Sequence, residues 1–326
     1  MRRRDLVTLI GAAAVAPARI ARAQQAQLPV IGFLHSGSPG PFAKVVAAFR
    51  EGLREAGYVP GQNVRVDFRW AEGNYELLPE LALDLVRRDV SVIVAGGSSP
   101  ALAAKNATRT IPIVFISGCD LVGSGLVTGL ERPGGNATGI NLVSTALNEK
   151  RLRLLHELVP NTTLVAALVN TSNPNSANQL ADIQQAARSL GQAIYIAKVT
   201  SEREIDAAFA SFPDFRPDGL FVGGDPFLYG RRNQIVRLAG RYELPAVYTQ
   251  RDFVLAGGLV SYGASLANGY RQAGAYAGRI LEGAAPADLP VTQSVTHELT
   301  INLKTAKRLD LTVPPSILAQ ASEVIE

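Results

Sequence analysis

An apolar run that leads through two glycines into a helix start constrains this chain more than any other stretch. Residues 91–104 read SVIVAGGSSPALAA, and the apolar part has no polar alternation. Such a run is typical of a strand that is covered on both faces in a parallel sheet. Pro100 suits the first position of a helix, and Ser99 before it suits the N-cap. We therefore expect a buried strand, a tight turn and a helix that begins at Pro100.

This turn is also the first candidate for ligand contact. In open α/β sheets, ligands bind beyond the carboxyl ends of the strands. Free amides at a helix start, together with its partial positive charge, favour a carboxylate or a phosphate. Ser98 and Ser99 occupy this position. The alternative is that Ser99 only caps the helix.

The two halves of the chain open with the same order of elements. An apolar strand at Val30–Leu34 is followed by a polar loop and an amphipathic helix, and Leu164–Val169 is followed in the same way by a loop and the helix Ala177–Leu190. Strands that alternate with helices through short connections predict parallel sheets. We therefore expect an α/β protein with two similar, Rossmann-like lobes.

The last part of the chain does not continue the second series in simple order. A chain that crosses between the lobes more than once would explain its remaining strands and helices, and several crossings form a hinge. We expect a first lobe of residues 28–141 plus 263–288, and a second lobe of residues 142–262 plus 289–326.

The net charge of +4 belongs to the first 23 residues, which hold five arginines and one aspartate. The rest of the chain has 27 basic and 27 acidic residues, so no basic excess points to a nucleic-acid partner.

Residues 1–23 have the pattern of an export signal. Arg2-Arg3-Arg4 precedes a modest apolar stretch, and Ala21-Arg22-Ala23 has the small residues that signal peptidase recognises. The arginine pair resembles a twin-arginine signal with an incomplete consensus. We predict cleavage after Ala23, the alternative being an amphipathic N-terminal helix. No later apolar run approaches the roughly 20 residues that span a bilayer. The mature chain is thus expected to be a soluble periplasmic protein.

The sequence predicts no cofactor and no metal ion. Cys119 is the only cysteine, and the three histidines lie far apart in the chain. Residues 123–129 imitate a dinucleotide fingerprint but follow their strand after too many residues. There is neither a phosphate-binding P-loop nor a nucleophile elbow. These observations argue against an enzyme.

Several segments carry a family resemblance, and together they cover essentially the whole mature chain. They are FREGLREAGY at 49–58, IPIVF at 111–115, GSGLV at 123–127 running into RPGGNATG at 132–139, LVPN at 158–161 and SYG at 261–263. With these segments the chain resembles the periplasmic substrate-binding proteins of ABC transporters, in the group that includes tryptophan- and tyrosine-type binding proteins.

The resemblance implies a type I periplasmic binding protein fold, with two Rossmann-like lobes and three crossovers. It implies a monomer that reversibly captures a small solute for a permease in the inner membrane, without catalysis. Characterised relatives bind amino acids, notably aromatic ones. This chain departs from the tryptophan-type members at residues 35–40, where HSGSPG lacks the acidic residue common in their first loop.

Loops at the carboxyl ends of strands supply the candidate ligand-binding residues. They are His35, Ser36, Ser98, Ser99, Cys119 and Asp120 in the first lobe, Asn170, Asn173, Asn175, Asp225, Tyr248 and Gln250 in the second, and Tyr262 where the chain returns between lobes. An acidic residue, Asp120 or Asp225, would suit an α-ammonium group. The rings of Tyr248, Tyr262 or Trp70 could stack on a flat ligand.

Each candidate has a structural alternative. Asp120 and Asp225 would cap the helices that follow them, and the three asparagines would form turns around Pro174. Tyr262 would pack at the hinge, and Cys119 would pack as a small apolar side chain.

The sequence thus favours an exported solute receptor of an ABC importer that captures a small polar or amino-acid-like ligand, including aromatic ones, by hinge closure. A ligand-sensing module of a membrane signalling protein uses the same capture chemistry and stays open as an alternative. A two-lobed periplasmic enzyme is the third hypothesis, and it would need a nucleophile or an acid/base pair that faces the cleft.

Overall fold

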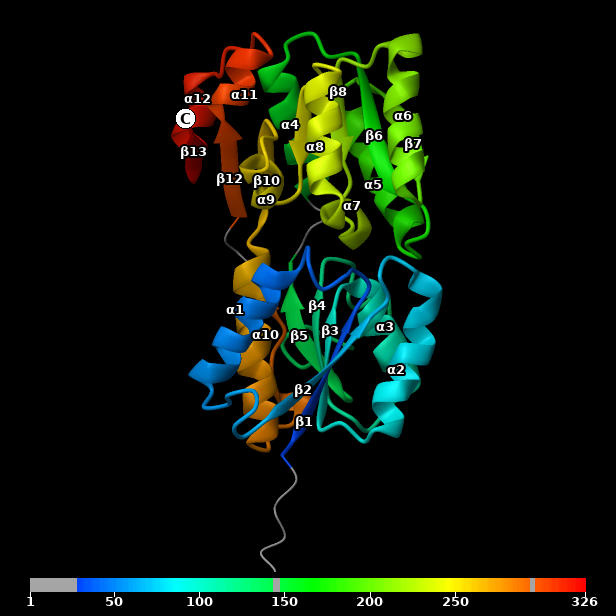
Figure 1. Cartoon of the computed structure of the whole chain (residues 1–326), viewed down its shortest axis with the longest axis vertical. Coiled ribbons are helices and arrows are strands. Elements are labelled where there is room, and N and C mark those ends of the chain that lie inside the picture. The colour runs from blue at the N-terminus through cyan, green and yellow to red at the C-terminus, as the bar shows by residue number, and fades with distance from the viewer. Residues whose placement is uncertain (1–27, 143–146, 294–296) are drawn as a thin grey trace, which may run out of the picture.

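The computed structural model describes residues 28–142, 147–293 and 297–326, and the predicted export signal at residues 1–23 lies outside them. The described chain forms two α/β lobes that are stacked along the long axis of the molecule (Figure 1). Each lobe is a sheet with helices on both faces, so the predicted fold class is confirmed.

The first sheet has six strands, and all of its neighbours pair in parallel. In spatial order these are β11 (Thr292–Gln293), β5 (Ala137–Asn141), β4 (Ile113–Ser117), β3 (Val92–Gly96), β1 (Val30–His35) and β2 (Arg65–Trp70). Every residue of β3 and β4 is buried, as the uninterrupted apolar runs predict.

The second sheet has seven strands. In spatial order these are β13 (Glu323–Ile325), β12 (His297–Asn302), β10 (Val260–Ala264), β9 (Ala246–Tyr248), β8 (Gly219–Val222), β6 (Leu164–Asn170) and β7 (Ala193–Val199). One pair, β10 with β12, is antiparallel. The second sheet is therefore mixed, whereas we predicted a parallel one.

Helices cover both faces of each sheet. Those of the first lobe are α1 (Ala43–Glu55), η1 (Tyr75–Leu77), α2 (Leu78–Arg87), α3 (Ser98–Ala107), α10 (Leu266–Leu281) and η3 (Pro286–Asp288). Those of the second lobe are α4 (Asn148–Leu158), α5 (Ser176–Ser189), α6 (Glu202–Phe215), α7 (Pro226–Gly230), α8 (Arg232–Arg241), α9 (Arg251–Leu255), α11 (Leu303–Arg308) and α12 (Pro315–Gln320).

The described elements require three passages of the chain between the lobes: from β5 to α4, from β10 to α10, and from β11 to β12. The last passage differs from our expectation that residues 289 onward lie in the second lobe. β11 pairs with β5, and the Thr138 hydroxyl donates to the Leu289 carbonyl at 2.6 Å. A two-residue strand carries too little sequence pattern to be recognised.

Helices α1 and α10 lie side by side on one face of the first sheet (Figure 1) and approach each other through glycines. A Cβ atom on Gly52 would lie 1.8 Å from the Arg271 carbonyl oxygen, and one on Gly274 would lie 2.2 Å from that of Phe49. Both neighbours are backbone atoms and cannot rotate away. The two helices therefore pack backbone against backbone.

We predict that Gly274→Ala lowers the free energy of unfolding by about 2 kcal/mol or more, because the added methyl group forces the two helices apart. This loss would outweigh the gain of up to about 1 kcal/mol in helix propensity. Urea unfolding followed by circular dichroism measures it. Gly40→Ala is the matched control, since a Cβ there meets no atom within 4 Å. Equal midpoints for the two variants would contradict the packing argument.

A cluster of aromatic rings surrounds His35, the last residue of β1. The ring centroids of Phe42, Trp70 and Tyr270 lie 4.1, 5.1 and 6.2 Å from that of His35. The Gly37 amide donates to Nδ1 at 2.8 Å, so the proton of the neutral ring is on Nε2, which lies 2.9 Å from the Tyr270 hydroxyl. Burial lowers the pKa of His35 to about 3.

His35 makes folding stability depend on pH. The unfolded chain takes up a proton below the ordinary pKa of 6.5, but the folded chain does so only near pH 3. The stabilising contribution is complete above pH 6.5 and is lost as the pH falls toward 3. Between about pH 7.5 and pH 5, the free energy of unfolding should therefore fall by about 2 kcal/mol more in wild type than in His35→Gln. Urea titrations at both pH values test this, and equal losses would show that folded His35 takes up a proton.

Candidate ligand pocket between the lobes

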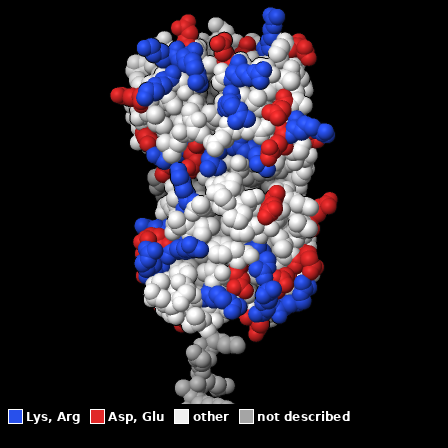
Figure 2. All heavy atoms as spheres, viewed as in Figure 1, with Lys and Arg blue, Asp and Glu red and all other residues white. Residues whose placement is uncertain are grey.

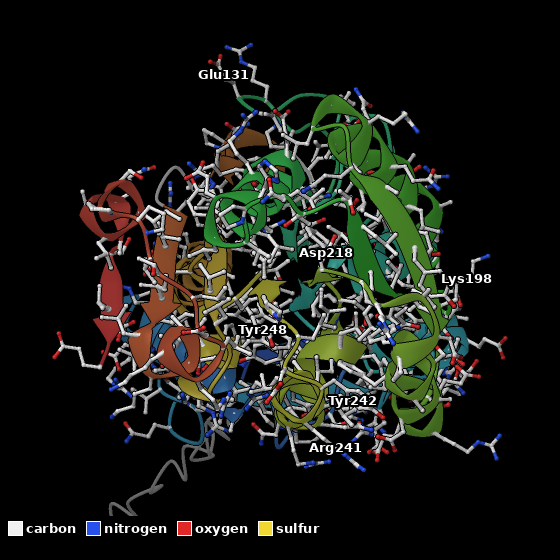
Figure 3. All side chains as sticks on the ribbon, turned by 90° about the horizontal axis from the view of Figure 1, so that it is seen from above. Glu131, Lys198, Asp218, Arg241, Tyr242 and Tyr248 are labelled. Atoms are coloured by element: carbon white, nitrogen blue, oxygen red, sulfur yellow. The ribbon has the colours of Figure 1, made fainter. Side chains whose placement is uncertain are left out.

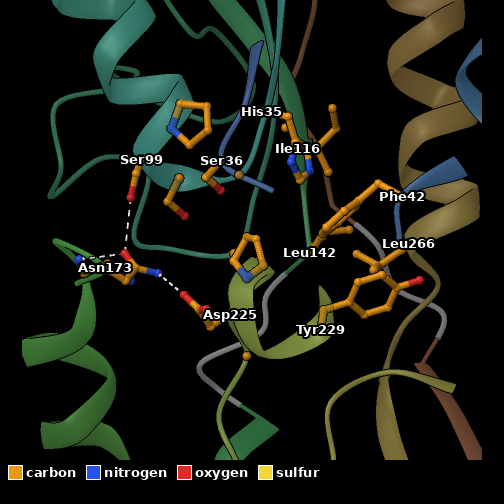
Figure 4. A pocket seen from close by; sticks show the side chains of 18 of the residues that line it. His35, Ser36, Phe42, Ser99, Ile116, Leu142, Asn173, Asp225, Tyr229 and Leu266 are labelled. Atoms are coloured by element: carbon orange, nitrogen blue, oxygen red, sulfur yellow. Dashed lines mark hydrogen bonds between the residues drawn. The ribbon is translucent and has the colours of Figure 1, made fainter. Parts of the chain in front are cut away.

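A cavity of about 130 Å³ lies where the carboxyl ends of the two sheets face each other (Figure 4). Its walls come from both lobes. The first lobe contributes His35, Ser36, Phe42, Tyr75, Gly96, Gly97, Ser98, Ser99, Pro100, Ile116, Gly118, Leu142, Leu266 and Tyr270, and the second contributes Asn173, Asn175, Gln179, Gly224, Asp225, Pro226, Tyr229 and Gln250.

Most of the residues that the sequence singles out line this cavity. They are His35, Ser36, Ser98, Ser99, Asn173, Asn175, Asp225 and Gln250. They come from loops that are far apart in the chain, and the two sheets bring them together because each loop follows the carboxyl end of a strand in a parallel part of its sheet.

Two candidates of the first lobe lie away from the cavity. Asp120 is exposed, and its Oδ1 accepts from the amides of Val122 and Gly123 at 3.2 and 3.0 Å. It therefore holds its own loop, and the helix that the structural alternative expected it to cap does not follow in the structure. Cys119 is buried, and its sulfur lies 3.2 Å from the Ser117 hydroxyl. It packs as a small apolar side chain beneath the loop.

Three candidates of the second lobe also do not line the cavity. Tyr248 is buried inside the lobe (Figure 3) and stacks on Phe253 with the ring centroids 4.7 Å apart. Tyr262 lies on β10 beside His297 of β12, at 5.8 Å between ring centroids. Asn170 is one layer behind the wall, where its Nδ2 donates to Asp225 at 3.1 Å.

The start of α3 differs from the predicted one. The helix begins at Ser98, and the residue before it is Gly97, whose φ of 115° favours glycine. No side chain caps this end. Ser99 is therefore not an N-cap, and its hydroxyl donates instead to Asn173 Oδ1 of the other lobe at 3.2 Å. The amides of Ser98 and Ser99 lie in the first turn, where a helix leaves them without intrahelical acceptors.

Asp225 is the centre of the polar wall and is 5% exposed. Its Oδ1 accepts from Asn170 Nδ2 and from the amides of Phe227 and Leu228, at 3.1, 2.8 and 3.1 Å. Its Oδ2 accepts from Asn173 Nδ2 at 2.9 Å and from the Tyr75 hydroxyl at 2.7 Å. Asp225 therefore caps α7, as the structural alternative expects, and also binds side chains of both lobes.

Tyr75 makes this contact from the other lobe, at the start of η1. It is almost fully buried, and burial is the main cause that raises the pKa of its hydroxyl, followed by the nearby charge of Asp225. The hydroxyl stays protonated and can only donate to the carboxylate. The hydrogen bond thus joins the lobes across the cavity.

Further contacts join the lobes around the cavity. The rings of Phe42 and Tyr229 lie 4.9 Å apart, and both belong to one buried apolar cluster that includes residues of both lobes. At the rim, Lys44 and Asp252 form an ion pair at 3.1 Å, with the lysine side chain 70% exposed. Such an exposed pair contributes little.

The aromatic part of the wall was not predicted from the sequence. Phe42, Tyr75, Tyr229 and Tyr270 line the cavity, and none of them is among the predicted ligand-binding residues. Three of these residues, Phe42, Tyr75 and Tyr229, lie just before or within the first turn of a helix that follows a strand, where cavity residues are common. This position was the available signal, but the apolar helix pattern also accounts for such residues.

The outer surface does not single out a further partner. On the face in Figure 2, acidic and basic side chains are interspersed over both lobes. Within the described ranges, no helix is both long and apolar enough to span a membrane. In the same ranges, no group of three or more His, Cys, Asp or Glu side chains is arranged to hold a metal ion.

Comparison with known proteins gives relatives over most of the chain. A tyrosine-binding protein of Clostridioides difficile is 29% identical over 268 residues, which cover 82% of this chain and 77% of that protein. A structure from Streptococcus pneumoniae in complex with L-Trp is 27% identical, covers 91% of this chain and all of the other, and gives a TM-score of 0.81.

A ligand-free, open structure of a substrate-binding protein from Clostridium difficile is 25% identical over 91% of this chain and 99% of the other, with a TM-score of 0.62. The family model described as ABC transporter substrate binding protein matches residues 37–325. This match covers both lobes and every residue of the cavity except His35 and Ser36. The chain therefore belongs to the family of ABC transporter substrate-binding proteins.

Proposed function

We propose that this protein is the exported solute receptor of an ABC importer, and that it captures a small polar or amino-acid-like ligand in the cavity between its lobes. The observation that carries the proposal is the cavity itself, which is enclosed by loops of both lobes at the carboxyl ends of parallel strands. A ligand in this place touches both lobes, so binding favours the arrangement in which the lobes meet.

The contacts between the lobes support hinge closure. Tyr75 with Asp225, Ser99 with Asn173, and Phe42 with Tyr229 all join side chains of different lobes. The chain also superposes better on the L-Trp complex than on the ligand-free, open relative, with TM-scores of 0.81 and 0.62. The described arrangement of the lobes is in our interpretation the closed one.

Two observations, one on the relatives and one on the cavity, support a ligand with a ring. The relatives are described as binding tyrosine and L-Trp. In this chain, Phe42, Tyr75, Tyr229 and Tyr270 line the cavity. Aromatic side chains favour flat partners that stack or meet them edge-on.

The place of action and the partner follow from the family and from the sequence. Export under the signal at residues 1–23 would release the mature chain into the periplasm, where a permease in the inner membrane receives the ligand. We propose that the receptor acts as a monomer. Association with a sensor protein is the alternative, and it would use the same cavity. Transport assays with the permease and ATPase partners in proteoliposomes distinguish the two roles.

We predict that Asp225→Ala lowers ligand affinity at least about tenfold, because it removes the shared acceptor of Tyr75 and Asn173 and leaves buried donors unpaired. Asp120→Ala is the matched control, since Asp120 is exposed and bonds only within its loop. Native mass spectrometry of the chain from Gln24 identifies a retained solute, and titration calorimetry then measures both variants. Equal losses in the two variants would contradict the proposed site.

Ligand binding is also expected to make the molecule more compact. Small-angle X-ray scattering should show a smaller radius of gyration with the saturating ligand than without it, because the open state has its lobes apart. Asp225→Ala should need more ligand to reach the same compaction. An unchanged radius of gyration in wild type, at concentrations where calorimetry shows saturation, would argue against closure.

A further inference from the structure

The charge pattern of the cavity restricts its ligand further than the family does, and this inference rests on the proposed function. Among the described residues that line the cavity, Asp225 is the only acidic one, and none is Lys or Arg. His35 is buried and neutral. Recognition of a charged group must therefore come from Asp225 or from neutral polar groups.

Asp225 has no acceptor capacity left for an ammonium group. A carboxylate offers about four lone-pair sites. The two oxygens of Asp225 already accept five hydrogen bonds from the protein. An α-ammonium group could reach this carboxylate only by displacing Tyr75 or Asn173, which are the donors that face it from the cavity wall. A buried ammonium without a carboxylate partner is strongly disfavoured.

A carboxylate, in contrast, would find donors without protein acceptors at the start of α3. The amides of Ser98 and Ser99 lie in the first turn of this ten-residue helix, and both residues line the cavity. Beside them is the Ser36 hydroxyl, which is 1% exposed and makes no hydrogen bond of good geometry within the described chain. Its polar neighbour is the Tyr75 hydroxyl, whose pKa burial raises and Ser36 lowers. The Ser36 oxygen lies 4.0 Å from the position that a Cβ on Gly97 would take, directly before the helix. These neutral donors form a place for an anionic oxygen.

The shape of the cavity fits one ring beside this place. Figure 4 shows Ser99, Asn173 and Asp225 on one side, and Phe42, Leu142, Leu266 and Tyr229 on the other. The cavity volume of about 130 Å³ is similar to the roughly 150 Å³ of an engineered cavity that accepts benzene. Asn173 lies between Ser99 and Asp225 and forms a hydrogen bond with each of them. It therefore separates the position proposed for the ligand carboxylate from the negative charge of Asp225.

We infer that this receptor selects monocyclic aromatic carboxylates that lack an α-ammonium group, with the carboxylate at Ser36 and the start of α3 and the ring among Phe42, Tyr229 and Leu266. This ligand class differs from the zwitterionic amino acids named for its relatives.

Three ligands that share one skeleton test the inference. Phenylalanine has both charged groups, hydrocinnamate lacks the ammonium, and phenethylamine lacks the carboxylate; benzoate and phenylacetate extend the acids to shorter chains. Titration calorimetry on the chain from Gln24 should show at least one acid binding about tenfold or more tighter than phenylalanine, with phenethylamine weakest. Phenylalanine binding as tightly as the best acid, or tighter, would overturn the inference and leave the receptor function in place.

A complete lack of binding by the acids would also overturn the inference. The proposed function is then judged separately, by native mass spectrometry after exposure to a cell extract. A retained solute of another class keeps the receptor function, and no retained solute counts against both.

Two variants test the assigned places. Ser36→Ala should lower the affinity for the best acid about tenfold, while Ser189→Ala, on the exposed end of α5, should not change this affinity.

Tyr75→Phe keeps the ring but frees one acceptor site on Asp225, so the ratio of the affinity for phenylalanine to that for hydrocinnamate should rise at least about fivefold. Tyr276→Phe is the control, because its hydroxyl bonds to Pro290 away from the cavity. An unchanged ratio in Tyr75→Phe would contradict the saturation of Asp225.

Discussion

The arrangement of the lobes depends on one buried carboxylate. A carboxylate that is taken out of water costs several kcal/mol unless donors replace its hydration, so Asp225 requires its full set of partners. Four of them, the side chains of Asn170 and Asn173 and the amides of Phe227 and Leu228, belong to the same lobe as Asp225. The Tyr75 hydroxyl comes from the other lobe and reaches Asp225 only when the lobes meet. In the closure that we propose, the full set of hydrogen bonds to Asp225 would therefore form only when the lobes meet.

The cavity combines this polar contact with an apolar one. Phe42 and Tyr229 belong to a buried cluster that includes residues of both lobes, so part of the interface excludes water by itself. Apolar burial favours contact without fixing direction, whereas the hydrogen bonds at Asp225 and Asn173 fix the register of one lobe on the other. The described contacts between the lobes thus combine a driving force with a defined geometry.

Much of the fold was predictable because parallel strands and their helices leave strong local patterns. The fully apolar β3 and the turn before α3 were recognised, and so were the two lobes. The antiparallel pairing of β10 with β12 was not, because strand direction is a property of the whole sheet. Among site residues, Asp225 was predicted, and its capping role and its place in the cavity both hold. Tyr248 was wrongly predicted to line the cavity because β9 ends inside the lobe, where Phe253 covers the tyrosine ring. Tyr75 was missed because its ring also fits an apolar helix face.

The contact between α1 and α10 has a mechanical consequence. With glycines at the crossing, no side chain lies between the two backbones that could change rotamer and let one helix slide on the other. Leu266 and Tyr270 in the early turns of α10 line the cavity, and the same helix follows the passage from β10 at Ser265. In the closure that we propose, a rotation that starts at this passage would therefore move α10 and α1 together as one rigid unit. The cavity wall formed by Leu266 and Tyr270 would move with the lobe and keep its shape.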